Sequence, residues 1–187
     1  IRWENNPDKF DIKTYIEEMG QAERNLLAGK VAPKLYTWDI EVVSDEFRKH
    51  PEANIQLPTR SDERSAGYDF YTPVDIVIPP QGRLLVWTDV KSYMQDNEVL
   101  MLYVRSSIGV KKGVVLSNGT GIIDASYYNN SVNDGRIGVS LFNTSDEEVR
   151  INAGERIAQG VFIQYLIADD DSVLNKERVG GFGSSGK

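Results

Sequence analysis

Hydrophobic residues recur with two different periods along the chain, and the change falls near residue 40. Before it, apolar side chains from Phe10 to Leu27 are spaced three and four positions apart, between a helix-start pattern at 5–8 and Gly29. Beyond it, apolar and polar residues alternate in short runs. The pattern predicts one amphipathic helix and a linker over residues 1–39, followed by a β-rich region.

Short strands are predicted throughout the region after residue 40. Two of them, 99–104 and 161–166, are nearly continuous apolar runs, which is typical of strands buried on both faces. Turn-forming Gly, Pro, Asn and Asp residues separate the strands. Many short strands at this spacing predict an all-β fold of the sandwich, jelly-roll or barrel type. The predicted strands are 40–43, 75–78, 84–87, 99–104, 136–142, 149–151 and 161–166.

Residues 169–187 differ in composition from the region before them. An acidic run is followed by closely spaced glycines and serines around Phe182. Such a segment forms either a frayed terminus or a lid, because glycines let backbone amides wrap around phosphate oxygens and serine hydroxyls add donors. We therefore divide the chain into a helical extension with a linker (1–39), a β domain (40–168) and a flexible Gly/Ser-rich C-terminal arm (169–187). We expect the N-terminal helix to pack on the body or on a neighbouring subunit, with contact to another protein as the alternative.

Composition limits the chemistry of this chain. It has 187 residues, 40% of them apolar, and a net charge of −7, which suits one globular domain and lacks the basic footprint of a nucleic-acid-binding protein. There is no cysteine, so disulfides and thiolate sites are excluded and a cytoplasmic location is favoured. The longest uncharged stretches, 113–123 and 157–168, are too short to cross a membrane. The single histidine, His50, is expected in a solvated loop, so catalysis must use carboxylates, hydroxyls, amides, backbone groups or a metal held by oxygen.

Four segments within the β region carry groups suited to chemistry. Asp69 lies between two aromatic residues, where a buried carboxylate needs a partner. The segment 105–109 offers a guanidinium, two hydroxyls and backbone amides to phosphate oxygens, although it also fits a capped turn. The segment 118–127 is a glycine-rich bend followed by a short strand and Asp124, which also fits a hairpin with an exposed acid. The fourth segment, 154–159, has the composition of a turn and the start of a strand.

Taken in order, these segments and the C-terminal arm resemble the five sequence motifs of the homotrimeric dUTP diphosphatase (dUTPase) family. The resemblance covers residues 40–187 and leaves out the helical extension. Three features depart from the family pattern: Arg178 stands one residue closer to the following glycines than is usual, the segment after Tyr127 is longer, and Ser107 stands where glycine is frequent. The matching stretches are 66–69, 105–107, 121–124 with Tyr127, 154–159 and 180–186.

The resemblance implies a jelly-roll-like all-β dUTPase fold and the Mg²⁺-dependent hydrolysis of dUTP to dUMP and pyrophosphate. Asp124 would be the general base that deprotonates a water for in-line attack on the α-phosphorus. The metal would be held mainly by the triphosphate and water, so no direct protein ligand is assigned. Each site would be built from three subunits of a homotrimer, with no nucleic-acid or membrane partner.

The resemblance also implies a set of substrate-binding residues. Uracil would pair with backbone groups of the hairpin 118–127 and with the Asn118 amide, while Tyr127 would stack on the deoxyribose and exclude a 2′-hydroxyl. Phe182 would close over the uracil as the arm folds down. Asp69 would support the phosphate site through bonds to backbone or water. The implied substrate-binding residues are Arg105, Ser106, Ser107, Asn118, Gly121, Ile122, Ile123, Tyr127, Gln159, Arg178, Phe182, Ser184 and Ser185.

Two other functions stay open on the sequence alone. A dCTP deaminase, or a bifunctional deaminase–dUTPase, shares the fold but needs an acidic residue soon after Asp124, and positions 125–130 contain none. A non-catalytic β-module that binds a regulatory protein would make use of the N-terminal helix. The presence of Asp124, Tyr127 and Phe182 together argues against that second alternative.

Overall fold

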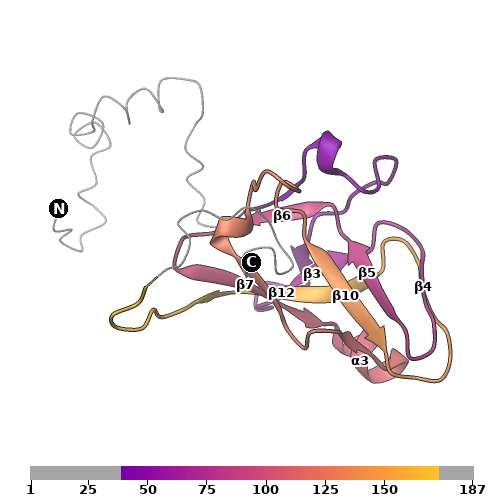
Figure 1. Cartoon of the computed structure of the whole chain (residues 1–187). Helices are drawn as coiled ribbons and strands as arrows, with labels where there is room; N and C mark the ends of the chain where they lie inside the picture. The colour runs from indigo at the N-terminus through magenta and orange to yellow at the C-terminus, as the bar shows by residue number, and fades with distance from the viewer. Residues whose placement is uncertain (1–38, 173–187) are drawn as a thin grey trace. The chain divides into compact units, whose positions relative to one another are not determined.

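The computed structural model describes residues 39–172. The chain divides into two units, Ile1–Tyr36 and Thr37–Lys187, and the described residues all belong to the second. The helix predicted before residue 39 and the arm after residue 172 lie outside the described residues. Within them, the chain folds into short strands with one short α-helix, as Figure 1 shows.

The strands are β1 (Asp39–Val42), β2 (Thr59–Arg60), β3 (Tyr68–Tyr71), β4 (Ile76–Ile78), β5 (Arg83–Trp87), β6 (Val90–Tyr93), β7 (Glu98–Val104), β8 (Val114–Leu116), β9 (Gly121–Asp124), β10 (Gly138–Asn143), β11 (Val149–Ile151) and β12 (Arg156–Gln164). The α-helix is α3 (Ser106–Lys112), and two 3-10 turns are η2 (Asp45–Phe47) and η3 (Ala125–Tyr127).

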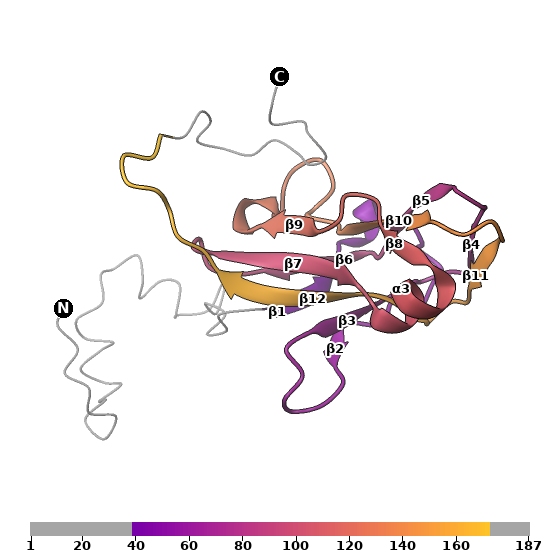
Figure 2. The same cartoon turned by 90° about the horizontal axis from the view of Figure 1, so that it is seen from below.

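A five-stranded antiparallel sheet in the order β2-β3-β12-β7-β9 positions most of the chemically interesting residues. β12 lies between β3 and β7, so that Gln159 faces Asp69 on one side and Tyr103 on the other. Figure 2 shows β9, β7 and β12 side by side. Three smaller antiparallel sheets, β5-β10-β8, β4-β11 and β1-β6, complete the described part of the fold.

Apolar side chains from these sheets form one continuous core. Alternate residues of β10 are buried, ending at Leu141 and Asn143, as expected for a strand with one inward face. At the centre of the large sheet, a Cβ on Gly160 would lie 2.8 Å from both Leu100 Cδ1 and Phe70 Cε2. Glycine at this position therefore lets the side chains of β7 and β3 close over β12.

The predicted all-β class is confirmed over the described residues, and each of the seven predicted strands overlaps an observed one. The prediction for 161–166 is nevertheless wrong in extent and burial. β12 begins earlier, at Arg156, and ends at Gln164, while Leu166 is 97% exposed. No described segment covers this end of the apolar run, so continuous apolarity here marks a surface rather than a strand buried on both faces.

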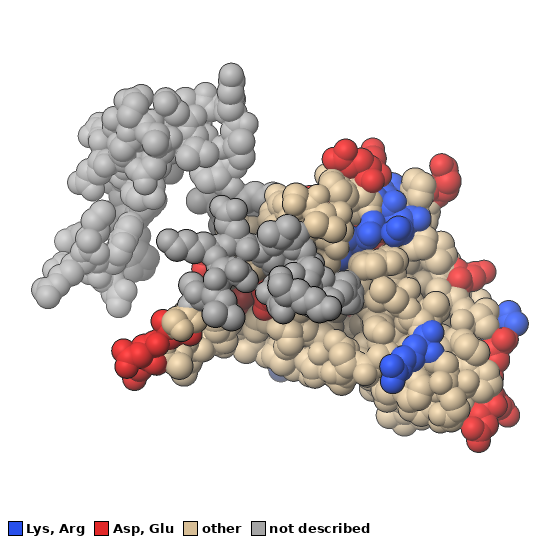
Figure 3. Space-filling model, viewed as in Figure 1, with Lys and Arg blue, Asp and Glu red and all other residues tan. Residues whose placement is uncertain are grey.

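The hydrophobic pattern does not predict β6 or α3. Lys91 and Ser92 of β6 are polar and yet buried, so the alternation that marks a strand is lost. Helix α3 is too short to show a period of 3.6, and Gly113 ends it with a φ of +64°. None of the helices within residues 39–172 is long and apolar enough to span a membrane. On the face seen in Figure 3, basic side chains occur in small separate groups.

The loop after η2 is tied to the turn between β5 and β6. Asp89 is fully buried with a φ of +55°, and its carboxylate accepts backbone N–H groups from Lys49 at 2.9 Å and His50 at 2.7 Å. The predicted loop position of His50 is confirmed, but the residue is half-buried rather than fully solvated.

Asn143 provides a test of how the β10–β11 connection is stabilised. Its side-chain amide is fully buried, donates to the carbonyl oxygens of Ile78 (3.1 Å) and Glu147 (2.7 Å), and accepts the Ser145 N–H (3.0 Å). We expect Asn143→Ala to lower the free energy of unfolding by about 2–3 kcal/mol, because buried backbone groups lose their partners. Urea denaturation at fixed protein concentration measures the change.

Gln81→Asn is the matched control for this variant. The exposed Gln81 amide also donates to a carbonyl of the same turn, that of Thr144 (2.9 Å), and asparagine tolerates its φ of +53°. Water can replace that exposed bond, so we expect a loss of less than about 0.5 kcal/mol. Equal losses for the two variants would contradict the role assigned to burial.

Candidate active site

The end of β7 presents the guanidinium and hydroxyl groups expected to hold phosphates. Arg105 follows β7 and caps α3, and its carbonyl accepts the N–H groups of Ile108 (3.0 Å) and Gly109 (2.8 Å). Ser106 and Ser107 begin the helix and are exposed. The turn from strand to short helix thus brings one cation and two hydroxyls to a single edge of the sheet.

Asp69 is the buried carboxylate around which this edge is organised. It is 2% exposed and accepts hydrogen bonds from Arg105 Nη1 (2.5 Å), Arg156 Nη1 (3.2 Å) and Ser61 Oγ (3.1 Å). These side-chain partners differ from the backbone or water partners expected from the sequence. Because one carboxylate holds two guanidinium groups, it fixes the direction in which both arginines present their positive charge.

Gln159 belongs to the same group of residues. It faces Asp69 across the β3–β12 ladder, and residues opposite each other in an antiparallel pair point to the same side of the sheet. A Cβ on Gly67 would lie 2.8 Å from Gln159 Oε1. Glycine in the segment before β3 therefore leaves the room that the Gln159 amide occupies.

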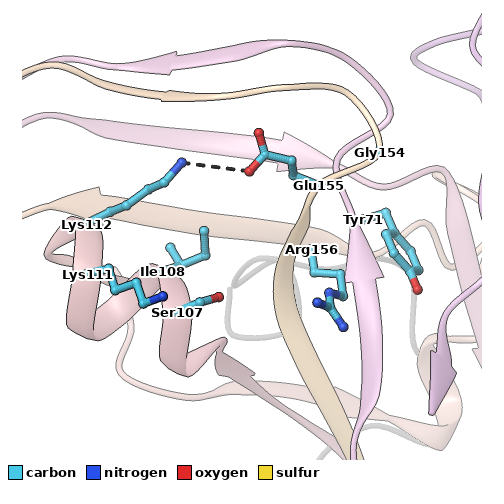
Figure 4. Close-up of a pocket in the computed structure, with 8 residues that line it drawn as sticks. All are labelled: Tyr71, Ser107, Ile108, Lys111, Lys112, Gly154, Glu155 and Arg156. Atoms are coloured by element: carbon cyan, nitrogen blue, oxygen red, sulfur yellow. Dashed lines mark ion pairs between the residues drawn. The ribbon is translucent and has the colours of Figure 1, made fainter. Parts of the chain in front are cut away.

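A hollow of about 530 Å³ adjoins these residues, between α3 and the beginning of β12 (Figure 4). Its three basic side chains outnumber its one carboxylate, Glu155, which pairs with Lys112 at 3.8 Å. Hydrogen bonds from the Asn152 N–H and from the Asn152 side chain, and then the charge of Lys112, lower the pKa of Glu155 from its usual 4.5. The net positive lining suits an anion. The lining residues are Tyr71, Ser107, Ile108, Lys111, Lys112, Gly154, Glu155 and Arg156.

A second pocket, of about 250 Å³, lies at the turn between β8 and β9. β8 pairs with β10 and β9 pairs with β7, in different sheets, so the hairpin predicted over 118–127 is wrong. The turn passes through Gly119, whose φ of +74° is a conformation that glycine adopts without strain. Asp124 ends β9 immediately beyond the pocket and is half-buried. Five residues expected to contact a nucleoside line this pocket together with Thr120 and Gly138: Asn118, Gly121, Ile122, Ile123 and Tyr127.

Tyr127 is held at both its hydroxyl and its backbone. The hydroxyl donates to the Arg136 carbonyl (2.9 Å) and accepts from Asn133 Nδ2 (2.7 Å), while Asn130 Nδ2 donates to the Tyr127 carbonyl (2.8 Å). None of the sequence motifs contains these three partners. The signal that could have found them is the asparagine-rich segment after Tyr127.

The two groups of residues lie at opposite ends of β7. Asp124 faces Val99 near the start of the strand, whereas Arg105 follows Val104 at its end. Six residues of extended chain separate these positions by about 20 Å. Within one chain, the residues around Asp69 therefore form one group and those around the second pocket form another, and the two groups do not meet. Arg178, Phe182, Ser184 and Ser185 lie outside the described residues.

Comparisons with known proteins relate this chain to one enzyme family. A sequence model of the dUTPase family matches residues 53–186. A deoxyuridine 5′-triphosphate nucleotidohydrolase of Lactococcus lactis is 48% identical over 139 residues, which cover 74% of this chain and 93% of that protein. The enzyme of the same name from Debaryomyces hansenii is 39% identical and covers 72% and 82%. The crystal structure of dUTPase from Streptococcus mutans superposes with a TM-score of 0.62 at 41% identity, covering 70% of this chain and 98% of that one.

Asp69→Asn tests whether this carboxylate organises the cationic edge. The substitution keeps the size of the side chain but leaves two arginines without their anionic partner, and Arg105 is only 20% exposed. We expect the free energy of unfolding to fall by about 1–3 kcal/mol, as for a lost hydrogen bond to a charged group. Asp75→Asn is the control, because the Asp75 carboxylate accepts one exposed N–H, that of Ala153 (2.8 Å). A loss no larger than that of the control would rule out the organising role.

Proposed function

The chain belongs to the dUTPase family and hydrolyses dUTP, and we propose that each active site joins the two groups of residues from different subunits. One observation carries this proposal: the pocket beside Asp124 and the cationic edge around Asp69 lie about 20 Å apart along β7. Cleavage next to the α-phosphorus needs the base and the phosphate-binding groups within reach of one triphosphate. A single chain cannot provide both at once.

Asp124 acts as the general base. Its carboxylate accepts a proton from a water whose oxygen forms a bond to the α-phosphorus, while the bond from that phosphorus to the β-phosphate oxygen breaks and pyrophosphate leaves. Its position at the end of β9, directly after the pocket-lining Ile122 and Ile123, supports this role. A nucleoside in the pocket would have its 5′-phosphate beside this carboxylate.

The phosphates bind at the other edge, to Arg105, Ser106, Ser107 and Gln159. An arginine remains charged at every physiological pH, and its planar group of donors matches phosphate oxygens. Asp69 acts on these phosphates through Arg105, whose guanidinium it holds at 2.5 Å. The adjoining basic hollow, with Lys111, extends the positive charge beyond the site itself.

The nucleoside binds in the pocket at the turn between β8 and β9. The Asn118 amide and the backbone of Gly121 and Ile123 offer hydrogen-bonding groups to the edge of uracil. Tyr127 is buried with its hydroxyl already bonded within the protein, so its ring rather than its hydroxyl is the group available to a sugar. A ring packed on the deoxyribose would leave no room for a 2′-hydroxyl.

We propose that the assembly is a homotrimer in which the C-terminal arm of a third subunit closes over the substrate. Arg178, Phe182, Ser184 and Ser185 of that arm would add donors to the phosphates and cover the uracil, excluding water other than the nucleophile. Exposed apolar side chains at the pocket and at the end of β12, Ile122 and Leu166 among them, are consistent with subunit contacts at both places.

The donor groups of the site fit a magnesium ion held through the substrate. Between residues 39 and 172, no three His, Cys, Asp or Glu side chains gather closely enough to hold a metal ion. The phosphate-binding groups are arginine, serine and glutamine, which bind phosphate oxygens rather than a cation. Bound to the triphosphate, Mg²⁺ would neutralise charge on the phosphate oxygens.

Asp124→Asn tests the base. We expect kcat for dUTP to fall by about 10²–10⁴-fold, because the amide cannot accept the proton from water. Affinity for a non-hydrolysable α,β-imido analogue of dUTP should stay nearly unchanged, since the pocket and the phosphate groups are intact. Asp96→Asn, which alters an exposed carboxylate, serves as the control. Activity similar to that of the control would show that another group activates the water.

Mixing two inactive variants tests the assembly of sites from different subunits. Asp124→Asn and Arg105→Ala each remove one part, so either protein alone should be inactive. After co-expression, a site is complete when one subunit supplies Asp124 and its neighbour supplies Arg105. Random assembly of equal amounts of the two variants provides this combination in about a quarter of the sites. Recovery of dUTP hydrolysis near that level is expected. No recovery in verified mixed oligomers would mean that both residues come from one chain.

A further inference from the structure

The segment 128–135, which follows Tyr127, is the long loop in which this sequence departs from the family pattern. Three of its residues have positive φ angles: Asn129 (+53°), Asp134 (+58°) and Gly135 (+83°). A Cβ on Gly135 would lie 2.8 Å from the Tyr127 carbonyl oxygen, so the loop folds back directly onto that residue. Asn, Asp and Gly adopt such angles more readily than other residues, so the contacts of the loop decide which shape it takes.

The loop in turn holds Tyr127. Asn130 and Asn133 bind its carbonyl and hydroxyl oxygens at 2.8 and 2.7 Å, and both asparagines are buried. Asn130 and Asn133 also bond to each other at 2.7 Å, and the Asn133 side chain accepts the Gly135 N–H at 3.1 Å. The position of the Tyr127 ring in the nucleoside pocket therefore follows from the conformation of the loop.

Lys91 of β6 holds the loop at both ends. Its ammonium group lies 2.9 Å from both carboxylate oxygens of Asp134 and 2.6 Å from Asn129 Oδ1. The side chains of Lys91 and Asp134 are each 10% exposed. Ser44 adds its N–H (2.8 Å) and hydroxyl (2.9 Å) to the same carboxylate. Two residues with positive φ angles, near opposite ends of the loop, are thus bound by one cation.

The electrostatics of this contact favour the charged pair. Burial by itself raises the pKa of Asp134, but hydrogen bonds from Ser44 and Lys91 outweigh it and hold the pKa below 3.8. Without the Asp134 charge, buried Lys91 would keep only the more distant Glu41 carboxylate, at 4.0 Å. Without Lys91, the buried Asp134 carboxylate would lose its cation, which is more costly than never having buried the pair. The loop conformation is therefore sensitive to this one contact.

We propose that Lys91 and Asp134 are positioning residues for sugar recognition: their buried ion pair fixes the loop 128–135 so that Tyr127 keeps its ring against the deoxyribose. The inference rests on the proposed role of Tyr127 as the residue that excludes a 2′-hydroxyl. It adds that selection of dUTP over UTP depends on a pair that does not line the pocket.

The test compares two substrates and one phosphate ligand. In Lys91→Met and Asp134→Asn, we expect the ratio of kcat/KM for dUTP to that for UTP to fall by about tenfold or more, within the range found for poorly fitted substrates. Asparagine suits the positive φ of residue 134, so the second variant changes the charge with little backbone effect. Inhibition by inorganic tripolyphosphate should change by less than about twofold, because the proposed phosphate-binding groups lie outside the loop 128–135 and outside its contacts with Lys91.

Control and combined variants separate the pair from a general effect on stability. Lys49→Met and Asp45→Asn make the same chemical changes at exposed positions and should leave both readouts unchanged. The double variant Lys91→Met/Asp134→Asn should lose no more selectivity than the stronger single variant, since both singles break one contact. Asn129→Gly removes one Lys91 contact without straining the backbone or changing the net charge. It therefore tests the role of the loop if the charge variants fail to fold. We expect a smaller fall in the dUTP/UTP ratio for this variant.

Tyr127→Ala in the same assays distinguishes failure of this inference from failure of the proposed site. If Tyr127→Ala lowers the dUTP/UTP ratio and folded pair variants do not, the inference is overturned while the role of Tyr127 stands. If Tyr127→Ala leaves the ratio unchanged, the role of Tyr127 and the inference both fail. A parallel loss of selectivity and of tripolyphosphate inhibition in the pair variants would also overturn it, because that result indicates a loosened fold.

Discussion

The pairing of β12 with β3 on one side and β7 on the other is the constraint on which the rest of the structure depends. The ladders set Gln159 opposite Asp69, and a slip of one residue would turn the Gln159 side chain to the other face of the sheet. The same register puts Arg105 at one end of β7, while the β7–β9 ladder puts Asp124 at the other. Backbone hydrogen bonds thus decide where the chemistry can occur before any side chain takes part.

Buried carboxylates then fix the positions of charged side chains, which the pairing of the strands leaves free. Asp69 binds two arginines at the phosphate edge, and Asp134 binds Lys91 at the loop that follows Tyr127. Each contact joins segments that are remote in sequence, 36 residues apart for Asp69 and Arg105 and 43 for Lys91 and Asp134. An unpaired charge in such a position is strongly unfavourable, so each pair admits few alternative arrangements. Both halves of the site owe their geometry to this requirement.

These contacts also explain how much of the molecule could be predicted from its sequence. Alternating hydrophobicity predicts strands such as β10, because each has one face in the core and one toward solvent. It misses β6, where Lys91 and Ser92 are buried, since the partner that makes burial of Lys91 tolerable lies far along the chain. The motifs identify Asp69, but not Arg156 and Ser61 as its partners, because local spacing carries no information about a contact across three strands.

Exposed apolar side chains link the assembly of subunits to the completion of the active site. Ile122 lines the nucleoside pocket and is 52% exposed, and Leu166 beyond β12 is almost fully exposed. A subunit contact that covers such side chains is favoured by roughly 25 cal/mol for each Å² of apolar surface removed from water. In the proposed trimer, the same contact would bring a cationic edge to each pocket. Assembly and completion of the catalytic site would then be one event, so an isolated chain would hold both halves of the site without being able to hydrolyse dUTP.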